Sequence, residues 1–275
     1  MPLSHVDVPG GRLHVVDEGA GPPIILLHAG IADLRSWDGL APLLITAGYR
    51  VIRYDARGFG RSTTDDVEFS PRADLDAVMD ALGIGRAALV GNSLGGMLAF
   101  DAAIESPERV VAVVGVAAGV GGFEREATRE ELVVFEEYGR VDQADPFDAA
   151  ALTAFEVHIW ADGPLQPAGR VGRAVSEPLF AMGLPLNLPE RVAGRRIALD
   201  PPASERLAEL RCPVLAVAGA LDFSRTVQVA HHLAAVAPNA RAVVWDDVAH
   251  MIAMEAPDRL AAAIVGFLAP LDRWS

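Results

Sequence analysis

Short apolar runs, each ended by polar or glycine-rich residues, recur along the chain and predict a β-sheet. Nearly continuous apolar strands are typical of a parallel sheet that is covered on both faces. An apolar hairpin pattern around Pro9-Gly10-Gly11 precedes them, at residues 6–8 and 13–16. The later runs are residues 24–27, 50–54, 87–90, 110–116, 214–218 and 242–245.

Amphipathic helical patterns separate these runs, which predicts an α/β fold with a parallel sheet and right-handed crossovers. The helical patterns cover residues 37–47, 70–82, 94–105, 227–236 and 257–268. The alternation stops between residues 120 and 203, where a charged amphipathic stretch at 124–137 is followed by proline- and glycine-rich breaks. We therefore expect a core made of residues 1–119 and 204–275, interrupted by a mostly helical insertion at 120–203.

The net charge of the chain argues against two classes of binding partner. The net charge is −14 over 275 residues, and phosphate binding needs a positive surface, so we expect no nucleic acid partner. Anionic membranes are disfavoured for the same reason, and no apolar stretch reaches the roughly 18 residues needed to span a bilayer. The N-terminus shows no signal peptide, so we expect a cytoplasmic protein that acts on a small molecule. The sequence is compatible with either a monomer or a homo-oligomer.

Several kinds of chemistry are absent from the sequence. All 23 basic residues are arginine, which excludes Schiff-base catalysis and a Walker-A lysine. The single cysteine, Cys212, precedes an apolar run, and buried packing explains it better than a catalytic thiol. No histidine or carboxylate spacing resembles a metal site such as H-E-x-x-H. We expect neither a metal nor a cofactor.

The segment Gly91-Asn92-Ser93-Leu94-Gly95 carries the strongest chemical signal. It is a G-x-S-x-G motif between an apolar run and a helical pattern, the context in which a strained turn exposes a nucleophilic serine. The N-terminus of the following helix points free N–H groups at the same place, which suits a developing oxyanion. We expect Ser93 to be the nucleophile and the N–H of Leu94 to be one oxyanion donor.

A serine nucleophile needs a base, and the base needs an acid that orients it. In an open α/β sheet these groups lie beyond the carboxyl ends of strands. Asp222 follows the apolar run 214–218, and His250 follows the run 242–245. The order Ser, Asp, His along the chain is the one expected for this type of sheet. We expect His250 to be the base and Asp222 the acid.

Competing residues are weaker candidates. Asp55 ends a strand, but an arginine partner in Asp55-Ala56-Arg57-Gly58 indicates a structural turn. Asp246 and Asp247 are too close to His250 in the sequence to reach its far nitrogen. The other candidate histidines lie in the hairpin, in a helical pattern or in the insertion, and no strand end positions the one in the insertion; they are His5 and His14, His231 and His232, and His158.

Together these motifs resemble the α/β-hydrolase superfamily over nearly the whole chain. The matching segments, in order, are Leu27-His28-Ala29-Gly30, Asp55-Ala56-Arg57-Gly58-Phe59-Gly60-Arg61-Ser62, Gly91-Asn92-Ser93-Leu94-Gly95-Gly96, Gly219-Ala220-Leu221-Asp222, and His250 with Glu255-Ala256-Pro257. The resemblance implies a mostly parallel eight-stranded sheet, with the insertion forming a helical cap over the active site. It also implies a structural His28 and a second oxyanion donor at Gly30. Ala29 departs from the glycine usual in the family, and this substitution bears on the shape of the oxyanion loop.

Within the superfamily, the chain resembles serine esterases and enol-lactonases of the 3-oxoadipate type. Epoxide hydrolases and haloalkane dehalogenases have aspartate at the nucleophile position, and plant-type hydroxynitrile lyases need a lysine. We therefore expect a serine hydrolase that cleaves a small or medium carboxylic ester, lactone or thioester. Cofactor-free haloperoxidases (perhydrolases), carbon–carbon bond hydrolases, a small-molecule receptor and a biosynthetic enzyme on this fold remain alternatives.

The substrate pocket is expected under the cap, where apolar and aromatic residues recur at helical spacing. Such residues pack a helical core more often than they contact substrate. The candidates are Ile31, Phe123, Phe135, Phe155, His158, Trp160, Phe180 and Met182.

Overall fold

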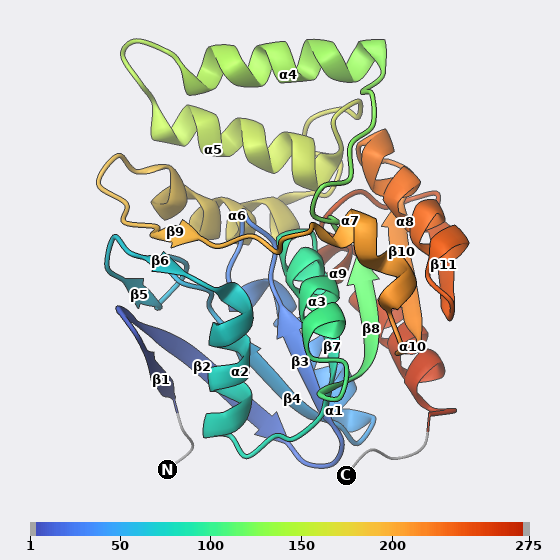
Figure 1. Ribbon diagram of the computed structural model, residues 1–275. Coiled ribbons are helices and arrows are strands. Elements are labelled where there is room, and N and C mark those ends of the chain that lie inside the picture. Colours follow the sequence, from blue (N-terminus) through green and yellow to red (C-terminus); the bar gives the residue numbers. More distant parts are fainter. Residues whose placement is uncertain (1–3, 272–275) are drawn as a thin grey trace.

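The computed structural model describes residues 4–271 and shows a central sheet with helices on both faces (Figure 1). Residues 1–3, part of the segment in which no signal peptide is visible, lie outside the described range. The strands are β1 (His5–Val8), β2 (Gly11–Gly19), β3 (Pro23–Leu27), β4 (Arg50–Tyr54), β5 (Thr63–Thr64), β6 (Glu68–Phe69), β7 (Ala87–Asn92), β8 (Val110–Val116), β9 (Arg195–Arg196), β10 (Val214–Gly219) and β11 (Ala240–Trp245).

The helices alternate with these strands except across the insertion. The α-helices are α1 (Ala41–Thr46), α2 (Pro71–Ala81), α3 (Leu94–Glu105), α4 (Arg129–Asp142), α5 (Ala149–Val157), α6 (Arg173–Gly183), α7 (Ala203–Arg206), α8 (Ser224–Val236), α9 (Ile252–Glu255) and α10 (Pro257–Leu268). Shorter helical turns are η1 (Leu34–Trp37), η2 (His158–Asp162), η3 (Leu184–Asn187) and η4 (Leu207–Glu209). None of the helices in the described range is long and apolar enough to cross a membrane.

The sheet is mostly parallel, which confirms the predicted fold class. Its strand order is β1-β2-β4-β3-β7-β8-β10-β11, and the two-residue β5 pairs with β2 as a ninth strand. Strand β2 runs antiparallel to its neighbours, whereas β4 to β11 along this path pair in parallel. The carboxyl ends of the parallel strands therefore meet at one edge, where loops from distant parts of the chain come together.

Side chains that alternate along the strands pack into two apolar layers, one on each face of the sheet. Ile25 and Leu27 of β3 pack on the face covered by α2, α3 and α8. Ile24 and Leu26 point to the opposite face, which α1 and α10 cover. Successive side chains of a strand point to opposite faces, so a strand buried on both sides reads as a continuous apolar run. This explains why the runs in the sequence located the strands.

Two helices differ from their predicted limits for local reasons. The pattern at 37–47 is divided into η1 and α1, and Pro42 stands in the first turn of α1, where its missing N–H is tolerated. Helix α4 begins at Arg129 rather than at residue 124. Thr128 and Glu131 form a reciprocal capping box there, with each side chain accepting the other's backbone N–H.

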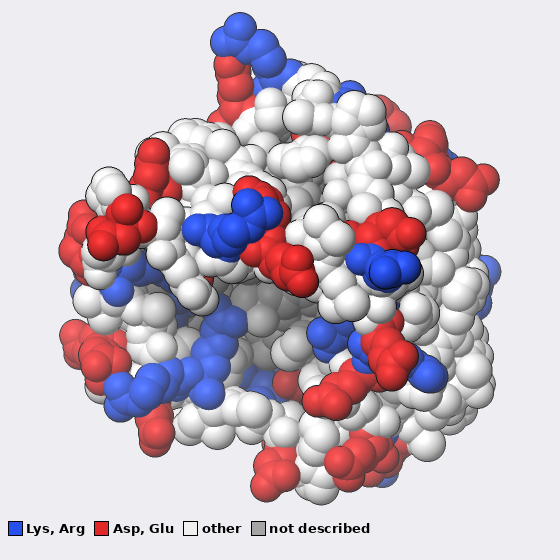
Figure 2. All heavy atoms as spheres, turned by 90° about the horizontal axis from the view of Figure 1, so that it is seen from above, with Lys and Arg blue, Asp and Glu red and all other residues white. Residues whose placement is uncertain are grey.

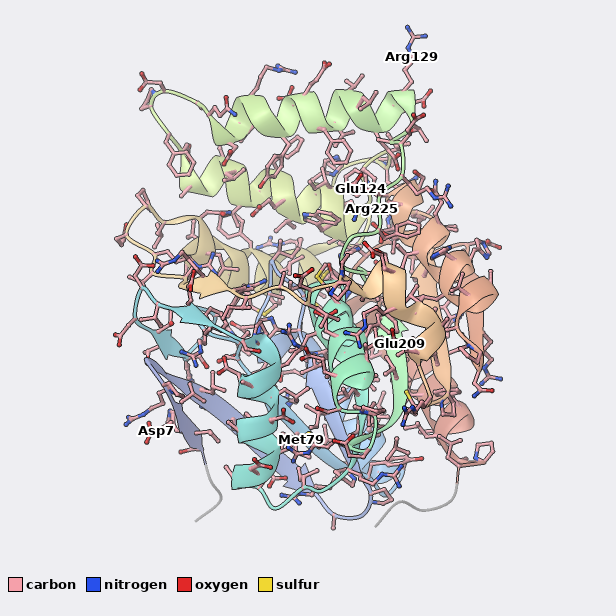
Figure 3. All side chains as sticks on the ribbon, viewed as in Figure 1. Asp7, Met79, Glu124, Arg129, Glu209 and Arg225 are labelled. Carbon is pink, nitrogen blue, oxygen red and sulfur yellow. The ribbon has the colours of Figure 1, made fainter. Side chains whose placement is uncertain are left out.

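Residues 120–203, which we call the cap, place α4, α5 and α6 above the carboxyl ends of the strands (Figure 1). Helix α4 is outermost, and Arg129 at its start points away from the molecule (Figure 3). Seen from this side, the surface is hollowed near its centre, with side chains of both charges around the hollow (Figure 2). The cap returns to the core through β9, which pairs in parallel with β6. The limits of this insertion, residues 120–203, stay a prediction.

Candidate active site

Ser93 occupies the sharp turn between β7 and α3. Its backbone dihedrals are φ 53° and ψ −111°, a conformation that costs a non-glycine residue of order 1–3 kcal/mol. The strand-end carbonyl of Val116 accepts the Ser93 N–H at 3.0 Å, and the Ser93 carbonyl accepts the N–H of Gly119 at 3.1 Å. These bonds to the loop after β8 hold the strained residue in place.

The glycines on either side of Ser93 are required by close backbone approach. A Cβ on Gly91 would lie 2.2 Å from the carbonyl oxygen of Gly95, and a Cβ on Gly95 would lie 2.1 Å from that of Leu27. Neither distance is tolerable, so only glycine allows α3 to pack this closely on β7 and β3. The two glycines of the G-x-S-x-G motif are therefore explained by steric constraints at this turn.

Asp222 and His250 are hydrogen-bonded to each other. The distance from His250 Nδ1 to Asp222 Oδ2 is 2.6 Å, and both side chains are buried. The second oxygen of Asp222, Oδ1, accepts the N–H of Phe223 at 2.7 Å. With Nδ1 bonded to the carboxylate, Nε2 is the nitrogen of His250 left for a substrate-side proton. His250 and Ser93 line the same cavity.

The loop that carries His250 is fixed from below. Asn92, next to Ser93, donates from Nδ2 to the His250 carbonyl at 3.2 Å. Glu255, whose side chain is 6% exposed, accepts the N–H of Ala249 at 2.9 Å, and Arg170 of the cap donates to Glu255 at 2.6 Å. Burial raises the pKa of Glu255 despite these two donors. The base is therefore tied to the nucleophile strand and to the cap.

The cap also contacts His250 from above through Trp160, in η2. The Trp160 carbonyl accepts the His250 N–H at 3.2 Å, and the two rings lie 4.5 Å apart between centroids at 46°. Trp160 also packs against Phe223, the neighbour of Asp222, with ring centroids 5.0 Å apart. One cap residue thus contacts the segments that hold the base and the acid.

Gly30 and Leu94, the expected oxyanion donors, lie side by side. A Cβ on Gly30 would lie 3.5 Å from Cδ2 of Leu94, an ordinary contact. Within residues 4–271, neither the Gly30 N–H nor the Leu94 N–H donates a hydrogen bond to another protein group. Both residues line the cavity that contains Ser93. The geometry leaves two N–H groups beside the serine without protein acceptors.

His28 and Ala29 support the oxyanion loop. His28 Nδ1 donates to the Ala29 carbonyl at 2.8 Å, and its Nε2 accepts the N–H of Ala56 at 3.0 Å. Burial lowers the pKa of His28, so the ring stays neutral and can make both bonds. The methyl group of Ala29 is buried in an apolar cluster with Met182 and Met251. The departure at Ala29 is accommodated by packing against the cap.

Asp55 is structural, but its partners differ from the expected ones. Its carboxylate accepts the backbone N–H groups of Leu34 and Arg61 at 2.9 and 2.8 Å. The side chain of Arg57 instead forms two 2.7 Å hydrogen bonds with Asp74, and both of these residues are buried. The interpretation of a structural turn holds, whereas the ion pair links Arg57 to α2.

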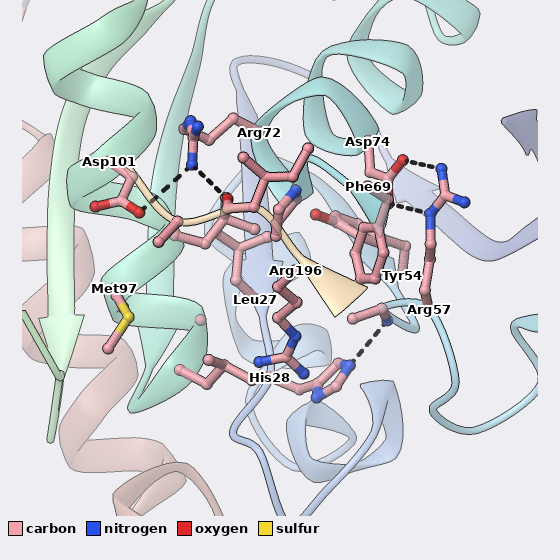
Figure 4. Close-up of a pocket in the computed structure, with 17 residues that line it drawn as sticks. Leu27, His28, Tyr54, Arg57, Phe69, Arg72, Asp74, Met97, Asp101 and Arg196 are labelled. Carbon is pink, nitrogen blue, oxygen red and sulfur yellow. Dashed lines mark hydrogen bonds and ion pairs between the residues drawn. The ribbon is translucent and has the colours of Figure 1, made fainter. Parts of the chain in front are cut away.

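A second cavity, of about 190 Å³, is lined by His28 (Figure 4) and shares Leu94 with the cavity that contains Ser93. The Arg57–Asp74 pair lines one part of it, and Asp101 of α3 lies 3.8 Å from Arg72 in another. The Oδ1 atom of Asp101 is buried without a hydrogen-bond partner, and burial raises the pKa of this carboxyl to about 6. This cavity contains neither Ser93 nor His250.

The cavity at Ser93 has a volume of about 360 Å³, within the range of small-molecule sites. Its lining consists of Ala29, Gly30, Ile31, Ser93, Leu94, Phe135, Tyr138, Glu156, Ile159, Trp160 and His250. Ile31, Phe135 and Trp160 were expected from the sequence. Tyr138, Glu156 and Ile159 were missed, because their side-chain directions depend on how α4, α5 and η2 pack.

Three expected pocket residues lie elsewhere. Phe123 packs against His232 of α8, with ring centroids 5.1 Å apart, and its carbonyl accepts from Arg225, beside Glu124 (Figure 3). His158 is bonded to Asp162 at 3.2 Å through the turn of η2. Met182 is buried in the apolar cluster behind Ala29. Helical spacing placed them on the cap, but not on its cavity face.

Phe155 and Phe180, the other two candidates from the sequence, are also outside this lining. Phe155 packs against the ring of Tyr138, with centroids 6.2 Å apart, and Phe180 packs against the cluster behind Ala29. Cys212 is buried, which confirms its expected packing role, and burial raises the pKa of its thiol to about 11. In the described part of the chain, no three His, Cys, Asp or Glu side chains form a group that could hold a metal ion.

Comparison with known proteins identifies the family to which this fold belongs. A model of the "alpha/beta hydrolase fold" family matches residues 22–257, which include the serine turn, Asp222 and His250. The chain belongs to the α/β-hydrolase family. The resemblance inferred from the motifs is thereby confirmed.

Curated relatives of this α/β-hydrolase have diverse activities. An epoxide hydrolase from Caballeronia sordidicola is 35% identical over 58% of this chain and 49% of its own length. A 2-hydroxy-6-oxo-6-phenylhexa-2,4-dienoate hydrolase from Burkholderia cepacia is 41% identical over 38% of each chain. The chain thus spans about half the length, or less, of these two relatives. They support a hydrolase but do not specify the bond that is cleaved.

Solved structures match nearly the whole α/β-hydrolase chain. One is described as an N-acyl homoserine lactone degrading enzyme; it is 27% identical, with a TM-score of 0.72 over 96% of this chain and 99% of its own. A hydrolase from Pseudomonas aeruginosa PA01 is 26% identical, with a TM-score of 0.75 over 97% and 98%. The enol-lactonase from Burkholderia xenovorans LB400 is 21% identical, with a TM-score of 0.74 over 96% and 99%, and shares the fold.

Proposed function

We propose that this α/β-hydrolase is a serine hydrolase that cleaves small or medium carboxylic esters, lactones or thioesters through an acyl-enzyme. The observation that carries the proposal is the 2.6 Å hydrogen bond between His250 and Asp222, together with the position of the His250 imidazole in the same cavity as Ser93. A nucleophile, a base and an orienting acid are the parts that acyl transfer requires. The same cavity is large enough for a small acyl group.

The reaction follows from these positions. His250 Nε2 takes the proton of Ser93 as Oγ attacks the carbonyl carbon, and Asp222 stabilises the imidazolium that forms. The tetrahedral oxyanion accepts the free N–H groups of Leu94 and Gly30. When it collapses, the ester C–O bond breaks, and the leaving oxygen takes the proton from His250. His250 next deprotonates a water that attacks the acyl group, and Ser93 is released with its proton restored.

The relatives with other activities define the alternatives. An epoxide hydrolase would need a carboxylate nucleophile where this chain has Ser93, so the likeness to the Caballeronia sordidicola protein supports only the shared scaffold. Carbon–carbon hydrolysis is the second candidate, because the Burkholderia cepacia relative is named as a dienoate hydrolase. The solved structure described as degrading N-acyl homoserine lactones favours ester chemistry.

The test compares the wild-type protein with Ser93→Ala on short p-nitrophenyl esters and simple lactones. We expect turnover by the wild type and a loss of about 10³-fold or more in the variant. Both proteins are also assayed with a dienoate substrate for carbon–carbon hydrolysis. Faster cleavage of the dienoate than of every ester would favour the alternative, and Ser93-independent turnover would contradict the proposal.

A further inference from the structure

One carboxylate lies among the cap residues that line the catalytic cavity. Glu156, on α5, lines it together with Ser93 and His250. Apart from Tyr138, the other cap residues that line this cavity present aromatic or aliphatic side chains; they are Phe135, Ile159 and Trp160. A charge in such apolar surroundings acts more strongly on a bound molecule than one on the open surface.

Two neutral donors hold the Glu156 carboxylate in position. The Tyr138 hydroxyl donates to Oε1 at 3.0 Å, and the Asn187 side-chain amide donates from Nδ2 to Oε2 at 2.6 Å. Asn187 is itself positioned by a 3.1 Å bond to the hydroxyl of Thr153. A carboxylate has about four acceptor positions, so these two bonds leave acceptor capacity on Glu156.

The charge of Glu156 is not neutralised by an ion pair. Within the described range, no arginine or histidine lies within salt-bridge distance of it. Arg191 is near enough for Glu156 to raise its pKa, but burial is the larger influence and lowers it. The Arg191 guanidinium donates instead to the carbonyls of Gly58 and Leu186, and Arg191 does not line the cavity.

We propose that Glu156 selects the substrate by charge, favouring esters and lactones that are cationic or carry a hydrogen-bond donor. This inference rests on the proposed ester hydrolysis. A donor or cation on the substrate would occupy the remaining acceptor positions of the fixed carboxylate. A carboxylate on the substrate would instead face Glu156 with no cation in the lining to compensate it.

The experiment uses three p-nitrophenyl esters that differ in charge at the end of the acyl chain. The cationic ester carries a 4-(trimethylammonio)butanoyl group, and the neutral one carries its isostere, 5,5-dimethylhexanoyl. The anionic ester is the adipate monoester. The value of kcat/KM above the uncatalysed rate is measured with the wild type, with Glu156→Gln and with Glu136→Gln. Glu136 is an exposed cap residue on α4, so its variant changes the net charge equally.

With the wild type, we expect the cationic ester to exceed its neutral isostere by roughly tenfold and the anionic ester to fall below both. Glu156→Gln should bring the two isosteres within about twofold of each other, whereas Glu136→Gln should keep the wild-type order. An anionic ester cleaved as well as the neutral one by the wild type would overturn charge selection, and this result needs no variant to fold. No turnover of any ester would overturn the proposed function itself, and this inference with it.

Discussion

The backbone N–H of His250 donates to the carbonyl of Trp160, and the two side-chain rings lie 4.5 Å apart. The proposed base is therefore held by the cap as well as by the core loop that carries it. This contact links the part of the chain that shapes the substrate cavity to the proposed proton transfer. We therefore expect the cap to affect the reaction rate as well as substrate access.

Trp160→Ala tests this relationship. The change keeps the backbone hydrogen bond but removes the indole that packs on His250 and Phe223. We expect kcat to fall about 10-fold to 100-fold, because a displaced base transfers protons poorly. Steady-state kinetics on a short ester measure it, and Trp160→Phe should recover much of the loss. An alanine variant with unchanged kcat would show that the ring contact does not position His250.

Asp222→Asn tests the orienting acid. The amide cannot stabilise an imidazolium and favours the wrong tautomer of His250, so kcat should fall about 10³–10⁴-fold with little change in KM. Asp247→Asn is a matched control, because this nearby carboxylate is exposed and pairs with Arg259 on the surface. Equal kinetic effects of the two substitutions would remove Asp222 from the proposed mechanism.

The buried pair of Arg57 and Asp74 should stabilise the junction between α2 and the loop after β4. Asp74→Ala would leave the Arg57 guanidinium buried without its carboxylate, since that residue is 3% exposed. We expect a loss of about 3–5 kcal/mol in the free energy of unfolding. Urea denaturation measures it. The double variant Arg57→Met with Asp74→Leu should lose less, and an equal or larger loss would contradict this account.

Asp101 should make stability depend on pH. Burial raises the pKa of its carboxyl to about 6 in the folded protein, from 3.8, so the folded state binds the proton more tightly than the unfolded state. This group therefore lowers stability as the pH rises from about 4 to 6, and its full penalty is present above that range. Asp101→Asn should then stabilise the protein at pH 8 by roughly 1–3 kcal/mol relative to its effect at pH 4.

Urea unfolding of the wild type and Asp101→Asn at both pH values provides the check. Arg72 keeps Glu105 as an ion-pair partner in the variant. A difference in stability between the two proteins that is the same at pH 4 and pH 8 would show that the carboxyl of Asp101 titrates normally.

Most strands and helices of the core could be predicted from the sequence, because burial gives them a characteristic pattern of apolar residues. The strand at β3 is a continuous apolar run since Ile24 and Ile25 face opposite buried layers. Asp222 and His250 were found because each follows such a strand, and the sheet brings strand ends together. These inferences needed only the period of the pattern and the topology of parallel sheets.

For the cap, the sequence predicted the helices but not which of their side chains line the cavity. Its apolar residues recur at helical spacing whether they face the cavity, as Phe135 does, or the interior, as Met182 does. No motif in the sequence singles out Glu156, because its partners Tyr138 and Asn187 lie 18 and 31 positions away. Spacing along one helix cannot reveal contacts between different helices, so the polar cluster required the tertiary structure.

The most direct test of the central claim is the site of covalent labelling by a fluorophosphonate probe. The probe phosphonylates a serine hydroxyl that a neighbouring base activates. Peptide mass spectrometry should find the adduct on Ser93 in the wild type, with labelling slowed strongly in His250→Ala and absent in Ser93→Ala. An unlabelled Ser93 in a folded wild-type protein, or labelling of Ser93 that is as fast without His250, would contradict the proposed nucleophile and base.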